Sequence, residues 1–257
     1  MLTLEQIKKY VGENTFERSP KAALIEYLQH EILDSLFKQK NSEKLSFIGG
    51  TAIRIVYQSQ RFSEDLDFDN FGLRFADFKK LLNDTARDMS LKGFKLEFRF
   101  VEKMAFHCYI KFPNILFLNK LSLNDDEKIL IRIDTVEKDK NITPRTHILN
   151  NFGVYRKILV NPIETILSQK ILTILERKRE KGRDFYDVSY LLGIIKPDYE
   201  YLKNNRNWNM IDIKEKLLRK VGELNMKELS DEVLPLLLKP EDIDRILTFK
   251  EYIEQKL

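Results

Sequence analysis

Cysteine is almost absent from this 257-residue chain, which contains only Cys108. A single thiol excludes an internal disulfide framework and a cysteine-rich zinc site. The three histidines, His30, His107 and His147, are scattered and form no HExxH pair, so a zinc enzyme of that type is not indicated either. One thiol and no disulfide suit a reducing compartment, and we expect a cytoplasmic protein.

Long apolar runs and several common nucleotide-binding motifs are also missing. No apolar run approaches the roughly 20 residues that a membrane span needs, and the first residues, MLTLEQIKKYVGE, lack an apolar core of signal-peptide length. The chain has no GxxxxGK[ST], no GxGxxG and no HRD or DFG motif, so P-loop, dinucleotide-binding and protein-kinase functions have no support.

Composition leaves room for a large core. With 43% hydrophobic residues, the chain suits one large domain or two modest ones. We expect an α+β fold, with a mixed sheet flanked by helices over residues 1–155 and a helical domain over 156–257. Lysine and arginine exceed acidic residues by 44 to 40, and the pI near 8.9 is compatible with a polyanionic partner without requiring one.

The stretch FIGGTAIRIVYQSQRFSEDLDFD, residues 47–69, organises the rest of the chain. It predicts a buried strand, a turn at Gly49 and Gly50, a short helix opened by Thr51, a polar loop and a second strand. Glycines without a Cβ let backbone N–H groups approach a ligand, and the helix start favours an anion. The second strand alternates with period two, which puts Asp65, Asp67 and Asp69 on one face.

Clustered carboxylates at this strand favour a cation. Two ionised carboxylates about 4 Å apart repel by roughly 4 kcal/mol at an effective dielectric of about 20, so such a site requires positive charge. Carboxylate oxygens suit Mg²⁺, which completes its coordination shell with water and substrate phosphate. The sequence therefore predicts a metal site beside a phosphate site.

Three later segments alternate like strands. Residues 94–100 and 106–112 predict an antiparallel pair joined near Glu102 and Lys103, with His107 on a solvated edge. Residues 128–136, KILIRIDTV, place Asp134 near the end of an apolar strand, where it would complete a three-carboxylate cluster if that strand lies beside residues 65–69. Residues 137–151 are polar and read as a loop, and residues 154–160 as a last strand.

The helical half carries charges on apolar faces. Lys170 lies within the apolar stripe of the helix that opens at Asn161 and Pro162. It could direct its ammonium to water along its stem, or it could reach phosphate. Asp184 could be an N-cap with Asp187 in the first turn, or both could orient Lys170 or a nucleotide. A basic run surrounds them: Arg177, Lys178, Arg179, Lys181 and Arg183.

The spacing of Asp65, Asp67 and Asp69 also begins like an EF-hand loop, but Asn70 stands at its glycine position and Ala76 at its glutamate position. The assembled motifs instead resemble the AbiEii/AbiGii-type nucleotidyltransferase toxins of the DNA polymerase β-like superfamily. The matching segments, in order, are GGT followed by RFSEDLDF (residues 61–68), IRID (131–134), the Lys170 helix, and RDFYD (183–187). Together they span residues 47–192.

This resemblance implies an NTP-dependent enzyme with two Mg²⁺ ions bound by Asp65 and Asp67, with Asp134 helping to bind the ion that activates the acceptor hydroxyl. It implies that Gly50 and Thr51 hold the outgoing phosphates and that Lys170 neutralises triphosphate charge. The remaining implied roles are a positioning role for Asp184 or Asp187 and a nucleotide site that also includes Gly49, Arg61, Ser63, Lys170 and Asp187.

In the family the acceptor is RNA, with tRNA 3′ ends modified by some members, and each toxin has a cognate antitoxin. Two alternatives stay open: the same chemistry on a small molecule or a protein side chain, and a catalytically silent nucleotide- or RNA-binding relative. We expect Asp65, Asp67 and Asp134 to cluster and Lys170 to reach the same site from the helical half.

Overall fold

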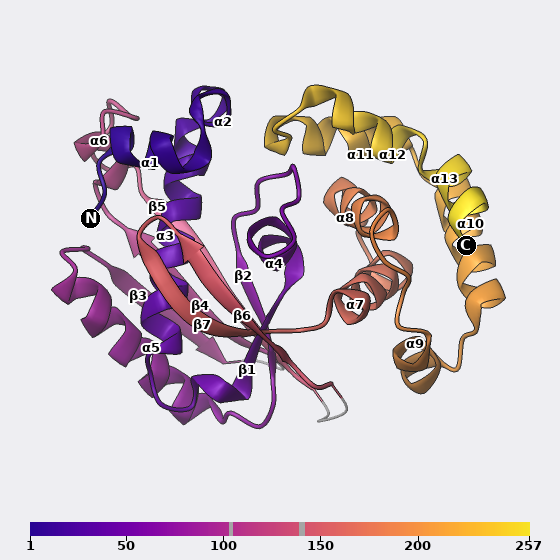
Figure 1. Ribbon diagram of the computed structural model, residues 1–257, viewed down its shortest axis with the longest axis horizontal. Coiled ribbons are helices and arrows are strands. Elements are labelled where there is room, and N and C mark those ends of the chain that lie inside the picture. The colour runs from indigo at the N-terminus through magenta and orange to yellow at the C-terminus, as the bar shows by residue number, and fades with distance from the viewer. Residues whose placement is uncertain (103–104, 139–141) are drawn as a thin grey trace. The chain divides into compact units, whose positions relative to one another are not determined.

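The structure is a computed structural model that describes residues 1–102, 105–138 and 142–257 (Figure 1). The chain divides into two compact units, Met1–Ala52 with Ser63–Val160, and Ile53–Phe62 with Asn161–Leu257. The division therefore follows Val160, and the second unit also takes in the short segment Ile53–Phe62 from the first half of the chain. The predicted link between the strands at 94–100 and 106–112 falls partly on residues 103–104, which lie outside the described residues.

A seven-stranded mixed sheet forms the first unit in the order β3-β4-β5-β2-β1-β7-β6. The strands are β1 (Leu45–Ile48), β2 (Leu66–Asn70), β3 (Glu97–Glu102), β4 (Phe106–Phe112), β5 (Ile129–Glu137), β6 (Arg145–Asn151) and β7 (Val154–Val160). Strands β2 and β5 are parallel, as are β1 and β7, whereas the other neighbours are antiparallel. The mixed sheet flanked by helices confirms the predicted fold class.

The hydrophobic alternation of residues 129–135 is confirmed in β5, where every second side chain is buried. The predicted loop over 137–151 is wrong in part, because β6 pairs with β7 along its whole length. Strand β6 lies at the edge of the sheet and most of its side chains are exposed, so its sequence RTHILNN is polar. Strand β3 is the opposite edge, which explains why Phe98 and Phe100 are only half-buried.

The first unit also contains helices. They are α1 (Leu4–Val11), α2 (Glu13–Arg18), α3 (Pro20–Phe37), α5 (Phe75–Leu91), α6 (Ile115–Leu118) and the 3₁₀ turn η1 (Ser42–Lys44). The predicted start of α3 is confirmed, because the Ser19 side chain accepts a hydrogen bond from the Ala22 N–H and Pro20 is the first helical residue. Helix α3 contacts α5 and crosses β7, and it is buried nearly all round.

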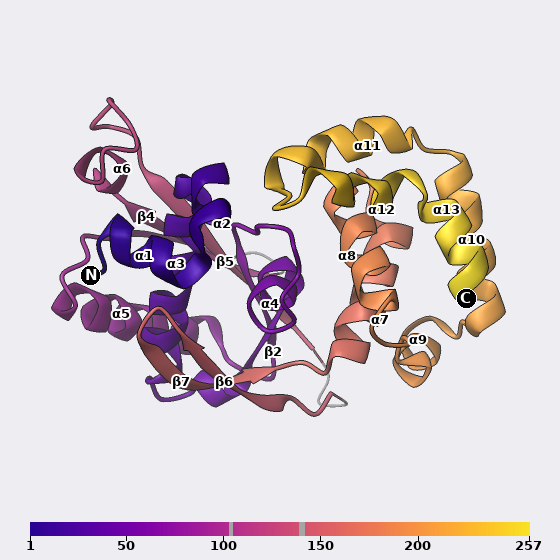
Figure 2. The same ribbon diagram turned by 45° about the horizontal axis from the view of Figure 1, so that its top comes forward.

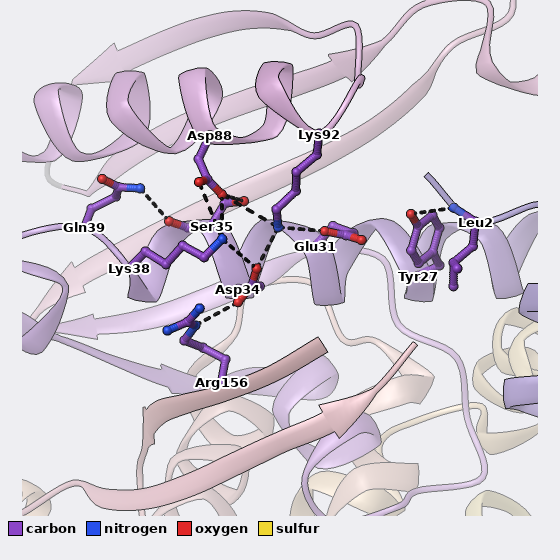
Figure 3. Close-up of polar contacts among 10 residues, drawn as sticks. All are labelled: Leu2, Tyr27, Glu31, Asp34, Ser35, Lys38, Gln39, Asp88, Lys92 and Arg156. Atoms are coloured by element: carbon purple, nitrogen blue, oxygen red, sulfur yellow. Dashed lines mark hydrogen bonds and ion pairs between the residues drawn. The ribbon is translucent and has the colours of Figure 1, made fainter. Parts of the chain in front are cut away.

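A charge cluster ties α3 to its neighbours (Figure 3). Asp34 on α3 contacts Lys92 and Arg156, each at 2.7 Å, and Lys38 at 3.1 Å. Burial raises the pKa of Asp34, but its bonds to Lys92 and Arg156 outweigh this and the net pKa is lowered. Because Lys92 follows α5 and Arg156 lies on β7, this cluster joins helices α3 and α5 to the sheet and has a structural role.

The second unit is helical in its Asn161–Leu257 part. Its elements are α7 (Ile163–Glu176), α8 (Gly182–Leu192), α9 (Tyr199–Arg206), α10 (Met210–Gly222), α11 (Met226–Val233), η2 (Leu234–Leu236), η3 (Pro240–Ile243), α12 (Asp244–Leu247) and α13 (Phe249–Lys256). Helix α8 packs on α7, α11 and α12, and α10 lies beside α13 (Figure 2). Within the described ranges, no helix has the length and apolar character needed to cross a membrane.

Candidate active site

A close backbone approach occurs at the start of α4 (Gly49–Ile55). The sequence predicted that this helix begins at Thr51, but it already begins at Gly49. Gly49 has φ +78°, and a Cβ there would lie 2.2 Å from Oδ2 of Asp67. Only glycine fits this position, because both the backbone conformation and the neighbouring carboxylate exclude a side chain.

The carboxylates of β2 do not share one environment. Asp67 pairs with Asp134 in the parallel register of β2 and β5, so the two side chains lie on the same face of the sheet. Asp65 precedes the strand, whose first residue is Leu66. Asp69 is 0% exposed, so the last of the three alternating carboxylates is buried.

Arg132 connects the two other predicted metal ligands. Its Nη2 donates to Oδ2 of Asp65 at 2.9 Å, and its Nε lies 2.9 Å from Oδ2 of Asp134 in an ion pair without hydrogen-bond geometry. Burial lowers the pKa of Arg132, but the charges of Asp65 and Asp134 outweigh this and raise it. The carboxylates thus already hold one positive charge.

His107 contacts the same group from the next strand. It faces Asp134 in the antiparallel register of β4 and β5, and its Nδ1 lies 2.7 Å from Oδ1 of Asp134. The prediction of a solvated edge is wrong for His107, because β4 lies between β3 and β5. His107 and Arg132 together hold both oxygens of Asp134 in place.

The acidic side chains fit a divalent cation by their chemistry. Asp65, Asp67 and Asp134 offer only oxygen donors, and two of them already bind a cationic group. Among the described residues, no three or more His, Cys, Asp and Glu side chains are arranged as a preformed metal site. A divalent ion at these carboxylates would therefore replace or rearrange the contact with Arg132.

Of three further predicted residues, Thr51 contacts this group directly, through the backbone of Asp65. The hydroxyl of Thr51, which is fully buried, donates to the backbone carbonyl of Asp65. The carbonyl of Ser63 accepts a hydrogen bond from Gln29 at 2.8 Å, and Gly50 is buried in α4. The Thr51 hydroxyl is thus engaged in holding the chain just before β2.

The second unit contains a buried ion cluster. The Lys170 ammonium lies 2.9 Å from Oδ1 of Asp184 and 2.8 Å from Oδ2 of Asp187. The Lys170 ammonium is paired with these carboxylates and does not extend to water, and the side chain is only 12% exposed. Asp184 is not the predicted N-cap: Lys181 occupies that position, and Asp184 contacts Lys170 and Arg177 from the first turn of α8.

Arg61 completes this cluster from the segment Ile53–Phe62. Its guanidinium donates three hydrogen bonds of 2.8–3.1 Å to the carboxylate of Asp187 and one of 2.8 Å to the carbonyl of Phe62. The two side chains are 1% and 0% exposed. Direct contact of either with a nucleotide, as the resemblance implies, would require this pair to open.

Opposite charges dominate the titration of the cluster. Burial lowers the pKa of Lys170, but Asp187 and Asp184 outweigh it and the net pKa is raised. Burial raises the pKa of Asp184, but Lys170 and Arg177 outweigh it and the net pKa is lowered. Both groups are therefore charged at neutral pH.

Sequence reasoning missed His107, Arg132 and Arg177 as members of these groups. Arg132 had a usable signal, since it lies two residues before Asp134 on the same face of a strand. Arg177 belongs to a run of basic residues that was interpreted as a whole, so its separate contact was not predicted. For His107 no local signal existed, because its contact depends on which strand β4 pairs with.

Comparison with known proteins agrees with the fold and the motifs. Two solved structures are similar over 93% of this chain: JHP933 from Helicobacter pylori (18% identity, TM-score 0.54, 94% of that chain) and a candidate nucleotidyltransferase from H. pylori (19% identity, TM-score 0.56, 97% of that chain). No curated protein sequence matches this chain. The family model "Nucleotidyl transferase AbiEii toxin, Type IV TA system" matches residues 31–248, which is most of the chain and includes every motif described above. The chain therefore belongs to the AbiEii nucleotidyltransferase toxin family of type IV toxin–antitoxin systems.

Proposed function

We propose that this nucleotidyltransferase transfers an NMP group from an NTP to a hydroxyl of RNA, at the 3′ end of tRNA, in a Mg²⁺-dependent reaction. The observation that carries the proposal is the parallel register of Asp67 with Asp134, beside a Gly49 backbone that leaves no room for a Cβ. We propose that it acts in the cytoplasm, where a cognate antitoxin is its partner.

The reaction replaces a phosphoanhydride bond of the NTP with a phosphodiester bond to the acceptor. The acceptor oxygen bonds to the α-phosphorus, the bond from that phosphorus to the pyrophosphate oxygen breaks, and the hydroxyl proton is released to solvent. Bound Mg²⁺ ions would neutralise the phosphates and favour the ionised acceptor. Asp65, Asp67 and Asp134 are the residues we assign to hold these ions.

Residues around these carboxylates keep them in position. His107 fixes one oxygen of Asp134, and Thr51 holds the carbonyl of Asp65. Gly50 and Thr51 are our assignment for the outgoing phosphates, with Gly49 and Ser63 as further contacts of the nucleotide. Positioned groups of this kind lower the barrier because little rearrangement is left for the transition state.

Lys170 is our assignment for a triphosphate contact. An ammonium has three N–H donors, and Asp184 and Asp187 take up two of them, which leaves one for a phosphate oxygen. Asp184, Asp187 and Arg61 then act through Lys170, whose direction they fix. This assignment gives the buried cluster of the second unit a role in positioning.

Transfer to RNA can be tested with each labelled NTP in turn, Mg²⁺ and total RNA, and then with tRNA whose 3′ hydroxyls are intact or destroyed by periodate. We expect label on the intact tRNA alone. Asp67→Asn should lower the rate at least about 100-fold. Asp231→Asn is the matched control, because Asp231 is exposed on α11, well beyond the motifs in the sequence.

Each alternative has its own outcome. Label on protein or on a small molecule in place of RNA would contradict the RNA acceptor and keep the chemistry. Absence of transfer with every NTP, or equal transfer by wild type and Asp67→Asn, would refute the catalytic assignment.

A further inference from the structure

A hollow on the second unit combines an aromatic ring with several cations. It has a volume of about 240 Å³ and is lined by Leu175, Trp208, Lys216, Arg219, Lys220 and Glu223. Trp208 is the only tryptophan of the chain and stands in the short link between α9 and α10. None of these residues belongs to the site described above.

Two ion pairs fix the walls of this hollow. Arg206 at the end of α9 donates to Glu176 at the end of α7, with Nη2 and Oε2 2.9 Å apart. Lys220 on α10 pairs with Glu180, in the segment that follows α7. The first pair holds the α9 end of the link that carries Trp208, and the second holds the far end of α10, so both helices beside the hollow are fixed to α7 or the segment after it.

The tryptophan ring is left partly uncovered. Trp208 is half-buried among exposed neighbours, and its ring faces the ammonium of Lys216 at 4.8 Å. A large ring that a fold does not cover is common at recognition surfaces, because it offers much contact area at little entropic cost. The cation–π contact places the ammonium of Lys216 over one face of the ring, next to where a ligand would meet the exposed part of Trp208.

The charges at the hollow favour an anion. The charge of Lys220 is neutralised by Glu180. Of the other charged residues that line the hollow, Lys216 and Arg219 are cations and Glu223 is the anion. Arg219 is exposed and makes no hydrogen bond or ion pair with any residue that the structure describes. The exposed Lys178 and Arg179 directly precede Glu180 in the chain and add positive charge to this segment.

We propose that this hollow binds single-stranded RNA, with a base stacked on Trp208 and the phosphates next to it paired with Arg219 and Lys216. Stacking on an aromatic side chain together with a line of cations is how proteins hold single strands without reading their sequence. An acidic protein segment would use the cations but not the ring. The inference rests on the proposed function in that the RNA bound here is the acceptor.

Binding can be measured without catalysis, in the absence of NTP, with an oligouridylate of about ten nucleotides. Because Trp208 is the only tryptophan, quenching of its emission reports on the hollow itself. We expect quenching on addition of the oligonucleotide. By anisotropy of a labelled oligonucleotide, Trp208→Ala should weaken binding roughly tenfold and Trp208→Phe much less, since the ring is kept.

The role of the cations in RNA binding is tested by measuring affinity at several salt concentrations. Each phosphate contact on a single strand contributes about 0.7 to the slope of log K against log salt, so Arg219→Gln should reduce that slope by about 0.7. Lys227→Gln is the control, because Lys227 is an exposed lysine of the same unit on α11 and lies outside the hollow. It should leave the slope and the affinity unchanged.

The outcomes separate this inference from the proposed function. Transfer to RNA without quenching, together with equal binding by Trp208→Ala and wild type, would overturn the inference alone. Binding and quenching without transfer would contradict the proposed function alone. Polyglutamate bound more tightly than oligouridylate at the same salt would assign the hollow to a protein partner and overturn the proposal.

Discussion

The buried cluster of the second unit allows a quantitative prediction about stability. It contains three cations, Arg61, Lys170 and Arg177, and two carboxylates, Asp184 and Asp187. Replacing Asp187 by alanine leaves the 1%-exposed guanidinium of Arg61 without a carboxylate. Replacing Arg61 by methionine leaves Asp187 still paired with Lys170 at 2.8 Å.

The two substitutions should therefore differ in cost. Breaking a buried pair and leaving a charge uncompensated costs about 3–5 kcal/mol, so we expect a loss of this size for Asp187→Ala. Arg61→Met removes charged hydrogen bonds but leaves the cluster balanced, and about 2 kcal/mol is expected. The double variant should cost less than the sum of the two single ones, because the second substitution removes a group already deprived of its partner.

Urea unfolding followed by the emission of Trp208 measures this cost in the right place, since that tryptophan belongs to the second unit. At a slope of about 2 kcal/mol per molar urea, Asp187→Ala should shift the midpoint by about 2 M. A loss below about 1 kcal/mol for Asp187→Ala, or a larger loss for Arg61→Met, would refute the charge balance described here.

Three further predictions concern single groups. Gly49→Ala should cost about 1–2 kcal/mol from its positive φ alone and should lower transfer by displacing Asp67; wild-type stability and activity would contradict the close approach. Arg132→Gln should bind Mn²⁺ at least about tenfold more tightly by calorimetry, because a unit charge beside the carboxylates no longer competes; weaker binding would argue against this competition. The lowered pKa of Asp184, paired with Lys170, means that its contribution to stability is present above its ordinary value of 3.8 and is lost as pH falls through the folded value. The free energies of unfolding of wild type and Asp184→Asn should thus differ by a constant amount above about pH 5, and the difference should shrink in acid. A difference that grows in acid would contradict this prediction.

Much of the fold could be predicted from the sequence, because burial of one side of a helix or strand gives its apolar residues a regular spacing. The alternation of Ile129, Ile131 and Ile133 predicted β5, and Ser19 with Pro20 predicted the start of α3, both as the structure has them. Strand β6 was missed because an edge strand buries little, so its sequence carries no apolar alternation to detect. The start of α4 was misplaced because two glycines give little indication of a helix.

By itself, the sequence determined the motifs, their order and the faces on which their side chains lie. Only the tertiary structure decided which charges meet: Asp134 with His107 across β4 and β5, and Arg61 with Asp187 from distant parts of the chain. The physical reason is that periodicity reports which side of an element is buried, a local property. The neighbour that covers this side is chosen by the packing of the whole unit.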